Sequence, residues 1–395
     1  MQHYRMDPAL STELAAFGGS TLGRCFSCGN CTAVCGLSKG DTVFPRKIIR
    51  YLQVGLSDRL LESPEPWLCY YCGTCSDTCP RSAEPGELMM ATRRWLVSHY
   101  DWTGLSRRLY LSEAWELGLL GGIAALVLAL FLVPGWLGLP FGFAAIDAAA
   151  TEHVRLDLFA PNPVVHAGDL VLAALLALLL GINALRMAGF VARGRGALTI
   201  PLSIWLGKAY EFVFHAATQK RWLQCDNDAR GPWLRHFLLV TGYATMLLLV
   251  VAFLPVFQRD DAQFHWTALP GYYGTAVLLG ITAMAMRSRL QKKTQYHRFS
   301  HASDWMFLVL LFLTSLSGIA LHAMRLLDQP WPTYVLYVVH LMIAVPMLVV
   351  EVPFGKWNHL LFRPLAQYLV AVREAAMARQ PAPAVPARRA PATAR

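Results

Sequence analysis

The chain has 395 residues and a formal net charge of +10, with 55% hydrophobic and only 15% charged residues. Soluble domains carry about 25% charged residues, so a single soluble globule is excluded. Residues 1–116 contain 12 basic and 12 acidic side chains, and residues 117–395 contain 23 and 13. The whole excess of positive charge therefore lies among the long apolar runs. This argues against a nucleic-acid binder and favours a membrane protein whose charge sets its orientation.

Residues 1–110 predict a small soluble domain. Eight of the nine cysteines lie in residues 25–79, and no charged-then-apolar signal peptide precedes them. A cysteine-dense segment in a reducing cytosol favours metal ligation over disulfides. Between the two groups of cysteines, residues 44–55 predict a helix, with Pro45 in its first turn and Gly55 at its end. A second amphipathic stretch, about 86–99, leads toward the membrane.

The two groups of cysteines share the spacing C-x₂-C-x₂-C-x₃-C. Three thiolates two residues apart surround one cubane, and in two-cluster ferredoxins the fourth cysteine ligates the other cluster. Structural zinc is the alternative, but it usually takes two separated C-x₂-C pairs. We therefore expect two 4Fe–4S clusters, one on Cys25, Cys28, Cys31 and Cys79 and the other on Cys69, Cys72, Cys75 and Cys35.

Six apolar segments follow, at about 117–139, 169–190, 234–256, 269–287, 304–326 and 333–353. A membrane-spanning helix needs about 20 residues. The fourth segment has the shortest apolar run, so a five-span bundle is the alternative. The intervening loops 191–235 and 287–302 are rich in Lys and Arg, which by the positive-inside rule places them, both termini and the cysteine domain in the cytoplasm. Residues 200–224 predict an interfacial helix, and 371–395 a disordered cytoplasmic tail.

Four histidines lie in or at the edges of these segments, and such side chains are candidates for function in a membrane. His236 opens the third segment and His359 follows the sixth, both on the cytoplasmic side, so they are expected to share an inner haem b. His340 is about 28 Å from His359 if the chain between them is helical, so these two cannot bind the same iron. His322 lies at a depth similar to that of His340. Met246 and His265 are further candidates for an outer ligand.

The residues from His340 to Pro364, with the run Pro-Phe-Gly-Lys-Trp-Asn before His359, resemble the last haem-binding helix of nitrate-reductase gamma-type cytochromes b. That resemblance implies that His340 and His359 are axial ligands. The cysteine domain resembles the C subunit of heterodisulfide reductase. The two parts fused in this order resemble the C subunit of quinone-interacting membrane-bound oxidoreductase (Qmo) complexes, as does the Lys-Arg-Trp stretch before the third segment.

Two positions depart from these families. Met246 stands where the gamma-type family has a second histidine in the helix equivalent to the third segment, so His322 or another residue would have to complete an outer haem. The number of haems b is therefore one or two. Gly36 follows Cys35 in place of the usual proline, a minor change for cluster binding.

The sequence therefore predicts a mainly α protein: a two-cluster ferredoxin-like domain (1–110), a transmembrane cytochrome b domain (111–370) and the tail. The Qmo resemblance implies a multi-pass subunit of a bacterial or archaeal cytoplasmic membrane, within a quinone-dependent oxidoreductase complex. The same resemblance implies that the subunit carries electrons between quinone and cytoplasmic flavin/iron–sulfur partner subunits, linked to adenylylsulfate (APS) reductase in sulfur metabolism. The alternatives are a membrane subunit of another heterodisulfide-reductase-like or sulfite-reductase-linked complex, and a membrane-anchored redox sensor without haem. No feature indicates nucleic-acid binding.

Overall fold

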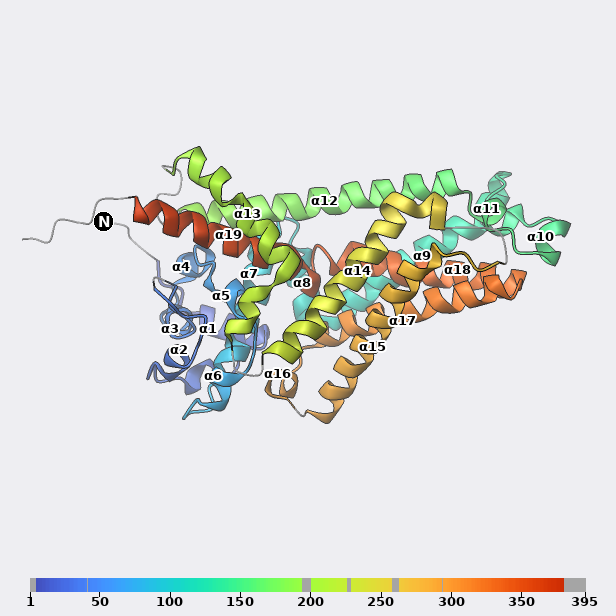
Figure 1. The fold of residues 1–395 in the computed structure, drawn as a ribbon. Helices are drawn as coiled ribbons and strands as arrows, with labels where there is room; N and C mark the ends of the chain where they lie inside the picture. Colours follow the sequence, from blue (N-terminus) through green and yellow to red (C-terminus); the bar gives the residue numbers. More distant parts are fainter. Residues whose placement is uncertain are drawn as a thin grey trace, which may run out of the picture.

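The computed structural model describes residues 5–40, 42–193, 200–225, 229–257, 263–292 and 294–379. Within these ranges the chain is mainly α-helical and has no sheet, only an isolated bridge between Lys39 and Thr42. Short helices of the N-terminal part gather at one end, and long helices form a bundle that extends away from them (Figure 1). The mainly α fold class is therefore confirmed.

The N-terminal part begins with short helices: α1 (Leu10–Ala16), α2 (Asn30–Ala33), α3 (Arg46–Val54), α4 (Ser57–Leu61), α5 (Glu65–Leu68), α6 (Thr74–Asp77), α7 (Pro85–Tyr100) and α8 (Leu105–Leu111). The helix predicted over 44–55 is α3. Pro45 is its N-cap, and Gly55 ends it with a φ of 78°, in the left-handed region that glycine adopts readily. Ile48, Ile49 and Leu52 form its buried face.

Helix α7 is the central element of this domain. Proline is favourable at a first helical turn because no intrahelical partner exists there for its missing N–H, and Pro85 holds this position in α7. The amphipathic pattern predicts one exposed face, but almost the whole helix is buried. It is covered because α1, α3, α5 and α6 of the domain and α12 (Asn162–Arg193) of the long bundle all contact it.

Six helices in the described residues are long and apolar enough to cross a membrane, the number that the sequence predicts. The fourth is the least apolar of them, as expected. They are α9 (Glu113–Leu132), α12 (Asn162–Arg193), α14 (Arg230–Phe257), α15 (Ala268–Gln291), α17 (Ala302–Leu326) and α18 (Pro330–Pro346), the last prolonged by a π-helical turn (Met347–Glu351).

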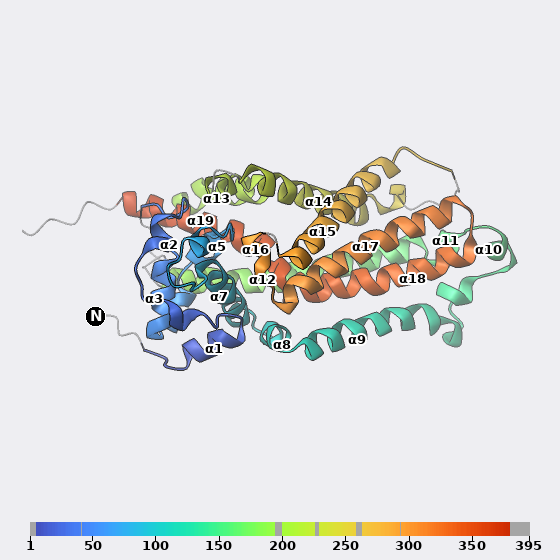
Figure 2. The ribbon, with the colours of Figure 1, turned by 90° about the horizontal axis from the view of Figure 1, so that it is seen from below.

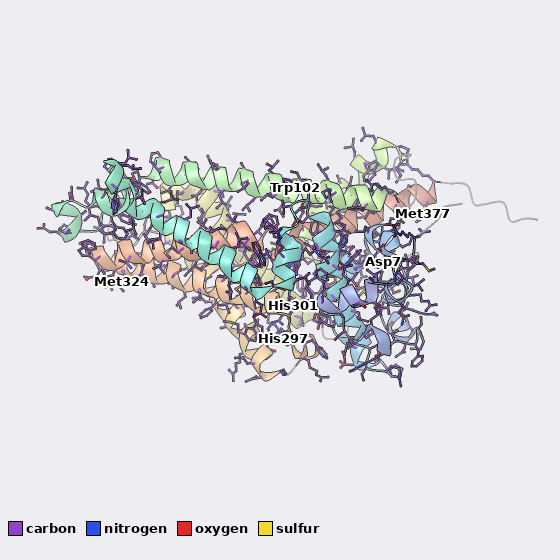
Figure 3. All side chains as sticks on the ribbon, turned by 180° about the vertical axis from the view of Figure 1, so that it is seen from behind. Asp7, Trp102, His297, His301, Met324 and Met377 are labelled. Atoms are coloured by element: carbon purple, nitrogen blue, oxygen red, sulfur yellow. The ribbon has the colours of Figure 1, made fainter. Side chains whose placement is uncertain are left out.

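The long helices pack as neighbours in the order α9, α18, α17, α15, α14 and α12. Figure 2 shows α9, α18 and α17 side by side, running away from the short N-terminal helices. At the far end, α10 (Ala148–Glu152) and α11 (Leu156–Phe159) cover the bundle, where the hydroxyl of Tyr334 accepts a hydrogen bond from the backbone N–H of Arg155 (2.9 Å). Met324 lies at this end, and Asp7 and Met377 lie at the other (Figure 3).

The chain does not continue as one helix from His340 to His359. After the π-helical turn it breaks, forms a 3₁₀ turn (Lys356–Asn358), and starts α19 (His359–Ala378). Helix α19 leaves the bundle and runs along the short helices, with α13 (Leu202–Thr218) packed against it (Figure 1).

Helix α19 extends past residue 370, so residues 371–378 are helical where the sequence predicts a disordered tail. They are ordered because Ala366, Leu369, Val370 and Val372 bury one face of the helix. Residues 380–395 lie outside the described residues. Helix α13 and the 3₁₀ turn Lys220–Gln224 occupy the segment predicted as an interfacial helix.

Candidate cofactor sites between the cysteine domain and the long helices

Both cysteine motifs adopt the same local backbone. Gly29 and Gly73 follow the second cysteine of each motif, have a φ of 93°, and begin the short helices α2 and α6. The thiol of Cys25 accepts a backbone N–H two residues on (3.4 Å), as does the thiol of Cys69 (3.3 Å). Such N–H···S contacts are typical of loops that surround an iron–sulfur cluster, since they stabilise the charge on sulfur.

The structure brings each predicted set of thiols together. The electrostatic neighbours of the Cys31 thiol are those of Cys25, Cys28 and Cys79. Cys35, Cys69, Cys72 and Cys75 line one small cavity. Burial raises the pKa of the Cys35 thiol to about 11 and also raises that of the Cys75 thiol, so their thiolates require a cationic centre.

These thiols are not arranged to bind a single ion. Among the described residues, no group of three or more Cys, His, Asp or Glu is placed to hold one metal ion. Zinc would need four sulfurs at about 2.3 Å from one centre. In a cubane each thiolate binds a different iron, so its four sulfurs lie farther apart than those around a single ion.

Two arginines lie against the second motif. Arg93 of α7 donates hydrogen bonds to the carbonyl oxygens of Pro66 (2.7 Å) and Cys69, and Arg363 of α19 also donates to that of Cys69 (3.2 Å). The Arg363 guanidinium lies over the Tyr70 ring, 4.3 Å from its centre. Burial first, and then Arg363, lowers the pKa of Arg93 to about 9. The positive charge is placed where the second cluster would carry its negative charge.

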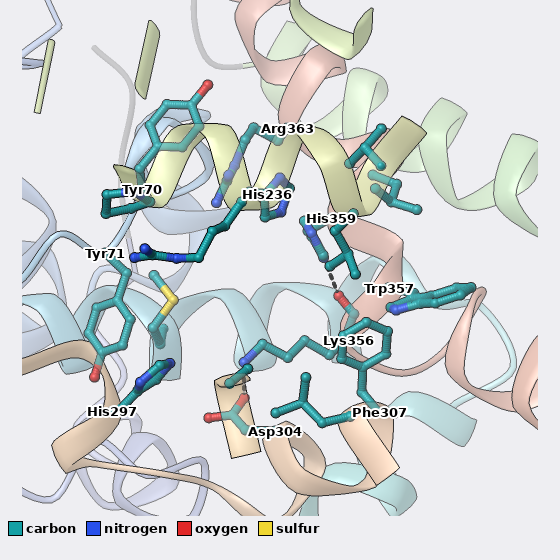
Figure 4. A pocket seen from close by; sticks show the side chains of 18 of the residues that line it. Tyr70, Tyr71, His236, His297, Asp304, Phe307, Lys356, Trp357, His359 and Arg363 are labelled. Atoms are coloured by element: carbon teal, nitrogen blue, oxygen red, sulfur yellow. Dashed lines mark hydrogen bonds and ion pairs between the residues drawn. The ribbon is translucent and has the colours of Figure 1, made fainter. Parts of the chain in front are cut away.

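A cavity of about 790 Å³ separates this motif from the long helices. Ligand pockets have volumes of about 300–1,000 Å³, so this one can take a large cofactor or a substrate. Its walls come from both parts of the chain, with Tyr71 on one side and His236 and His359 on the other (Figure 4), and Cys72 also lines it.

His236 and His359 face each other in this cavity, with ring centres 6.1 Å apart. Two imidazoles on opposite sides of one metal, each bonded at about 2 Å, would have ring centres roughly 6 Å apart. His236 lies near the start of α14, and His359 is the first residue of α19. The break after the π-helical turn is what brings His359 opposite His236.

The hydrogen bonds of both histidines leave the same nitrogen free. Nδ1 of His359 donates to the carbonyl oxygen of Lys356 (2.6 Å), and Nδ1 of His236 donates to the side-chain oxygen of Gln219 (2.5 Å). Ligating histidines usually donate their second ring nitrogen in this way. Burial, and then Arg363, keeps the pKa of His359 well below its usual range, so its imidazole is neutral, as a ligand must be. The two Nε2 atoms are therefore the ring nitrogens with which this pair could hold a metal-centred cofactor.

The outer candidates are placed differently. Nδ1 of His340 on α18 hydrogen-bonds to the hydroxyl of Ser317 (3.0 Å), and a side chain at Gly318 would press against its ring. Nε2 of His322 on α17 hydrogen-bonds to the Tyr272 hydroxyl instead (2.7 Å). His265 hydrogen-bonds to its neighbour Thr267, and Met246 packs against Gly274. The structure thus gives His340 and His322 separate partners and does not place them as a facing pair.

Several residues at or near the cavity could not be identified from the spacing of the sequence motifs. The Trp222 ring lies between Tyr70 and His236, 5.1 Å from each ring centre, and so links the second motif to the histidine pair. Lys356 forms an ion pair with Asp304. Figure 4 shows Asp304 on the wall of the cavity opposite His236. The only sequence signal for Trp222 is its place in the Lys-Arg-Trp stretch before the third span.

Comparisons with known proteins identify the N-terminal part. Residues 24–84 match the family model described as a 4Fe–4S dicluster domain. A protein of Archaeoglobus profundus that is described as similar to the C subunit of heterodisulfide reductase is 39% identical over 96 residues, 24% of this chain and 51% of that protein. The iron–sulfur C subunit of the CoB–CoM heterodisulfide reductase of Methanopyrus kandleri is 38% identical over 69 residues, 18% of this chain and 36% of that protein.

A third relative matches a stretch of similar length in this chain. The C subunit of the H₂:CoB–CoM heterodisulfide,ferredoxin reductase of Methanothermobacter thermautotrophicus is 34% identical over 88 residues, 22% of this chain and 48% of that protein. The chain spans about half the length, or less, of these three relatives. No solved structure matches the chain. The N-terminal part is therefore a 4Fe–4S domain like that of the heterodisulfide reductase C subunit, joined here to six helices that can span a membrane.

Proposed function

We propose that the chain is the membrane electron-transfer subunit of a quinone-dependent oxidoreductase complex. Its relatives are heterodisulfide reductase iron–sulfur subunits, which supports a role in electron transfer within a complex. A haem b between His236 and His359 supplies single-electron transfer at the junction of the two parts. The two histidines would hold and orient it, and the apolar side chains that line much of the cavity would pack against it.

One observation carries this proposal. His236 and His359 come from helices far apart in the sequence, face each other at 6.1 Å, and each have Nδ1 bound to an oxygen acceptor. Two buried histidines that only fill space need neither the spacing nor the matched orientation. The same cavity reaches Cys72, so a group held by the pair would lie next to the second cluster.

Ring contacts support a route for electrons between the second cluster and the histidine pair. Tyr70 is covalently next to Cys69, its ring is 5.1 Å from Trp222, and Trp222 is 5.1 Å from His236. Electrons would pass between the second cluster and the histidine pair over this short distance. The first cluster, on Cys25, Cys28, Cys31 and Cys79, lies farther from the cavity and would face the soluble partners.

Quinone is the proposed membrane substrate. Lys356 and Arg363 both line the cavity beside His359 and are able to donate hydrogen bonds to a quinone oxygen. A second haem on His340 would need a partner ligand other than His322 as it is arranged in this structure, where Nε2 of His322 is bonded to Tyr272. The resemblance to the Qmo C subunit supports cytoplasmic flavin/iron–sulfur partners and an indirect link to APS reductase. It also supports a cytoplasmic-membrane location with the cysteine domain inside.

The test is a dithionite-reduced absorption spectrum of the purified chain and of two variants, His236→Ala and His359→Ala. Each variant is expected to lose the haem b absorption of the inner site while keeping its iron and sulfide content. His153→Ala is the matched control, because His153 is exposed at the far end of the molecule and should leave the spectrum unchanged. Unchanged haem content in both test variants would refute the ligand assignment. No haem in the wild-type protein would leave only a membrane-anchored iron–sulfur protein.

A further inference from the structure

The ninth cysteine lies at the second cysteine motif. Cys225 is buried and lines the same small cavity as Cys35, Cys69, Cys72 and Cys75. Its electrostatic neighbours are the thiols of Cys72, Cys69 and Cys35. Five cysteines from three separate segments of the chain therefore line one small cavity, although a cubane takes only four.

Cys225 belongs to the part of the chain that holds the long helices, and it lines the cavity from that side. It ends the 3₁₀ turn Lys220–Gln224, just before α14. Two contacts fix this turn: Arg221 donates to the side-chain oxygen of Gln367 on α19 (2.6 Å), and Trp222 packs on Tyr70. The turn is therefore held by both α19 and the cysteine domain.

Gly36 provides the space for this approach. A Cβ at residue 36 would collide with the backbone carbonyl oxygen of Gln224 and would also contact that of Cys225. Any larger residue there, including the proline usual after the fourth cysteine, would push the turn away from the motif. The glycine at position 36 therefore allows the turn that carries Cys225 to lie against the second cysteine motif.

We infer that the Cys225 thiol donates an S–H···S hydrogen bond to the Cys72 thiolate of the second 4Fe–4S cluster and raises the reduction potential of that cluster. The inference rests on the proposed cluster ligands, but not on the haem. Cys225 has no iron to bind, because each iron of the cubane already has one cysteine. A thiol that keeps its proton is a weak donor.

The direction of the shift in reduction potential follows from the charge of the cluster. Reduction adds negative charge to the cluster and its thiolates, and a hydrogen bond to sulfur stabilises that added charge. The two motifs differ in the surroundings of this cysteine. Cys28, the counterpart of Cys72 in the first motif, is exposed. The Cys225 thiol thus favours reduction of the second cluster, which is the one nearer the histidine pair.

A matched pair of variants, Cys225→Ala and Cys225→Ser, tests this hydrogen bond. Both side chains are smaller than cysteine and leave similar space, but only serine keeps a donor. The readout is the midpoint potential of each cluster in the full-length protein, followed by electron paramagnetic resonance during a redox titration. Cys225→Ala should disfavour reduction of one cluster about tenfold, which is ~59 mV for one electron. Cys225→Ser should retain most of the wild-type potential, and the other cluster should not change in either variant.

A second variant moves the thiol without removing it. Gly36→Ala should displace the turn that carries Cys225 and lower the potential of the same cluster as Cys225→Ala does. Equal potentials in the alanine and serine variants and the wild type would overturn the inference. Loss of one cluster's iron and sulfide in Cys225→Ala would also overturn it, because Cys225 would then be a ligand. Neither outcome depends on haem content, so failure here is separate from failure of the haem assignment.

Discussion

Phe362 is expected to hold the cysteine domain against the long helices. It lies in the first turn of α19, is fully buried, and packs on Trp67 of α5 (ring centres 5.0 Å apart) and Tyr100 of α7 (5.6 Å). Replacing a buried phenylalanine by alanine costs about 3–5 kcal/mol, which includes the loss of aromatic pairs worth about 0.5–1.5 kcal/mol each. At about 1.4 kcal/mol per tenfold change, Phe362→Ala should increase the open population of this interface by roughly a hundredfold to a few thousandfold.

Cys225 reports this opening directly. Its thiol is buried between the two parts and is 7% exposed, and the other eight thiols are expected to be bound in clusters. The assay is the rate of alkylation of the cluster-loaded protein under conditions where opening is fast relative to the chemistry. Phe362→Ala should raise this rate by the factor above, and Phe362→Leu should give a smaller increase, roughly tenfold.

The matched control is Phe159→Ala. Phe159 is also buried, and it stacks on Tyr334 (4.7 Å) at the far end of the molecule. This change should lower the thermal stability by a similar amount and leave the alkylation of Cys225 unchanged. If Phe362→Ala lowers thermal stability but labels at the wild-type rate, Phe362 does not hold the domain, and the reasoning fails.

Two further predictions concern the charged groups near the cavity. Asp304→Asn should destabilise the protein by about 3 kcal/mol, because it leaves Lys356 and Arg289 without their shared carboxylate, and the double change with Lys356→Met should recover much of the loss. Equal thermal stability of the single and double variants would contradict this. His301, whose side chain caps α17, has its pKa lowered to about 4 by burial first and then by Arg94. Its unfolded pKa is about 6.5, so stability is full above that pH and falls as pH decreases toward 4. Melting temperatures at pH 7.5 and 5 should therefore differ less in His301→Asn, which keeps a cap but does not titrate; the same difference as in the wild type would rule the cap out as a cause.

The elements that are predictable are those set by local pattern. Cysteine spacing predicts the two loops, because the same glycine-dependent turn recurs at the same place in both motifs. Pro45 and Gly55 predict the limits of α3 through backbone chemistry alone. Six spans follow from length and apolarity. In each case the information lies within about 25 consecutive residues.

The features that are not predictable depend on contacts between distant segments. The predicted tail begins at residue 371, yet α19 continues to Ala378 because α13 and the cysteine domain cover its apolar face. Tyr70 and Trp222 meet across about 150 residues of sequence, and no spacing within either segment predicts their contact. Gly36 is a minor departure in the sequence, but in the fold the carbonyl of Gln224 occupies the space of its missing side chain.

The break before His359 links these two kinds of feature. If α18 had continued straight, His359 would lie along the same axis as His340 and could not turn toward α14. Instead, the carbonyl of Lys356 in the 3₁₀ turn orients the His359 ring, and α19 then carries Arg363 to the carbonyl of Cys69. One change of chain direction therefore sets both the histidine pair and the position of the second cysteine motif against it. Variants that straighten this turn should disturb both sites together, whereas the Cys225 variants should affect only one.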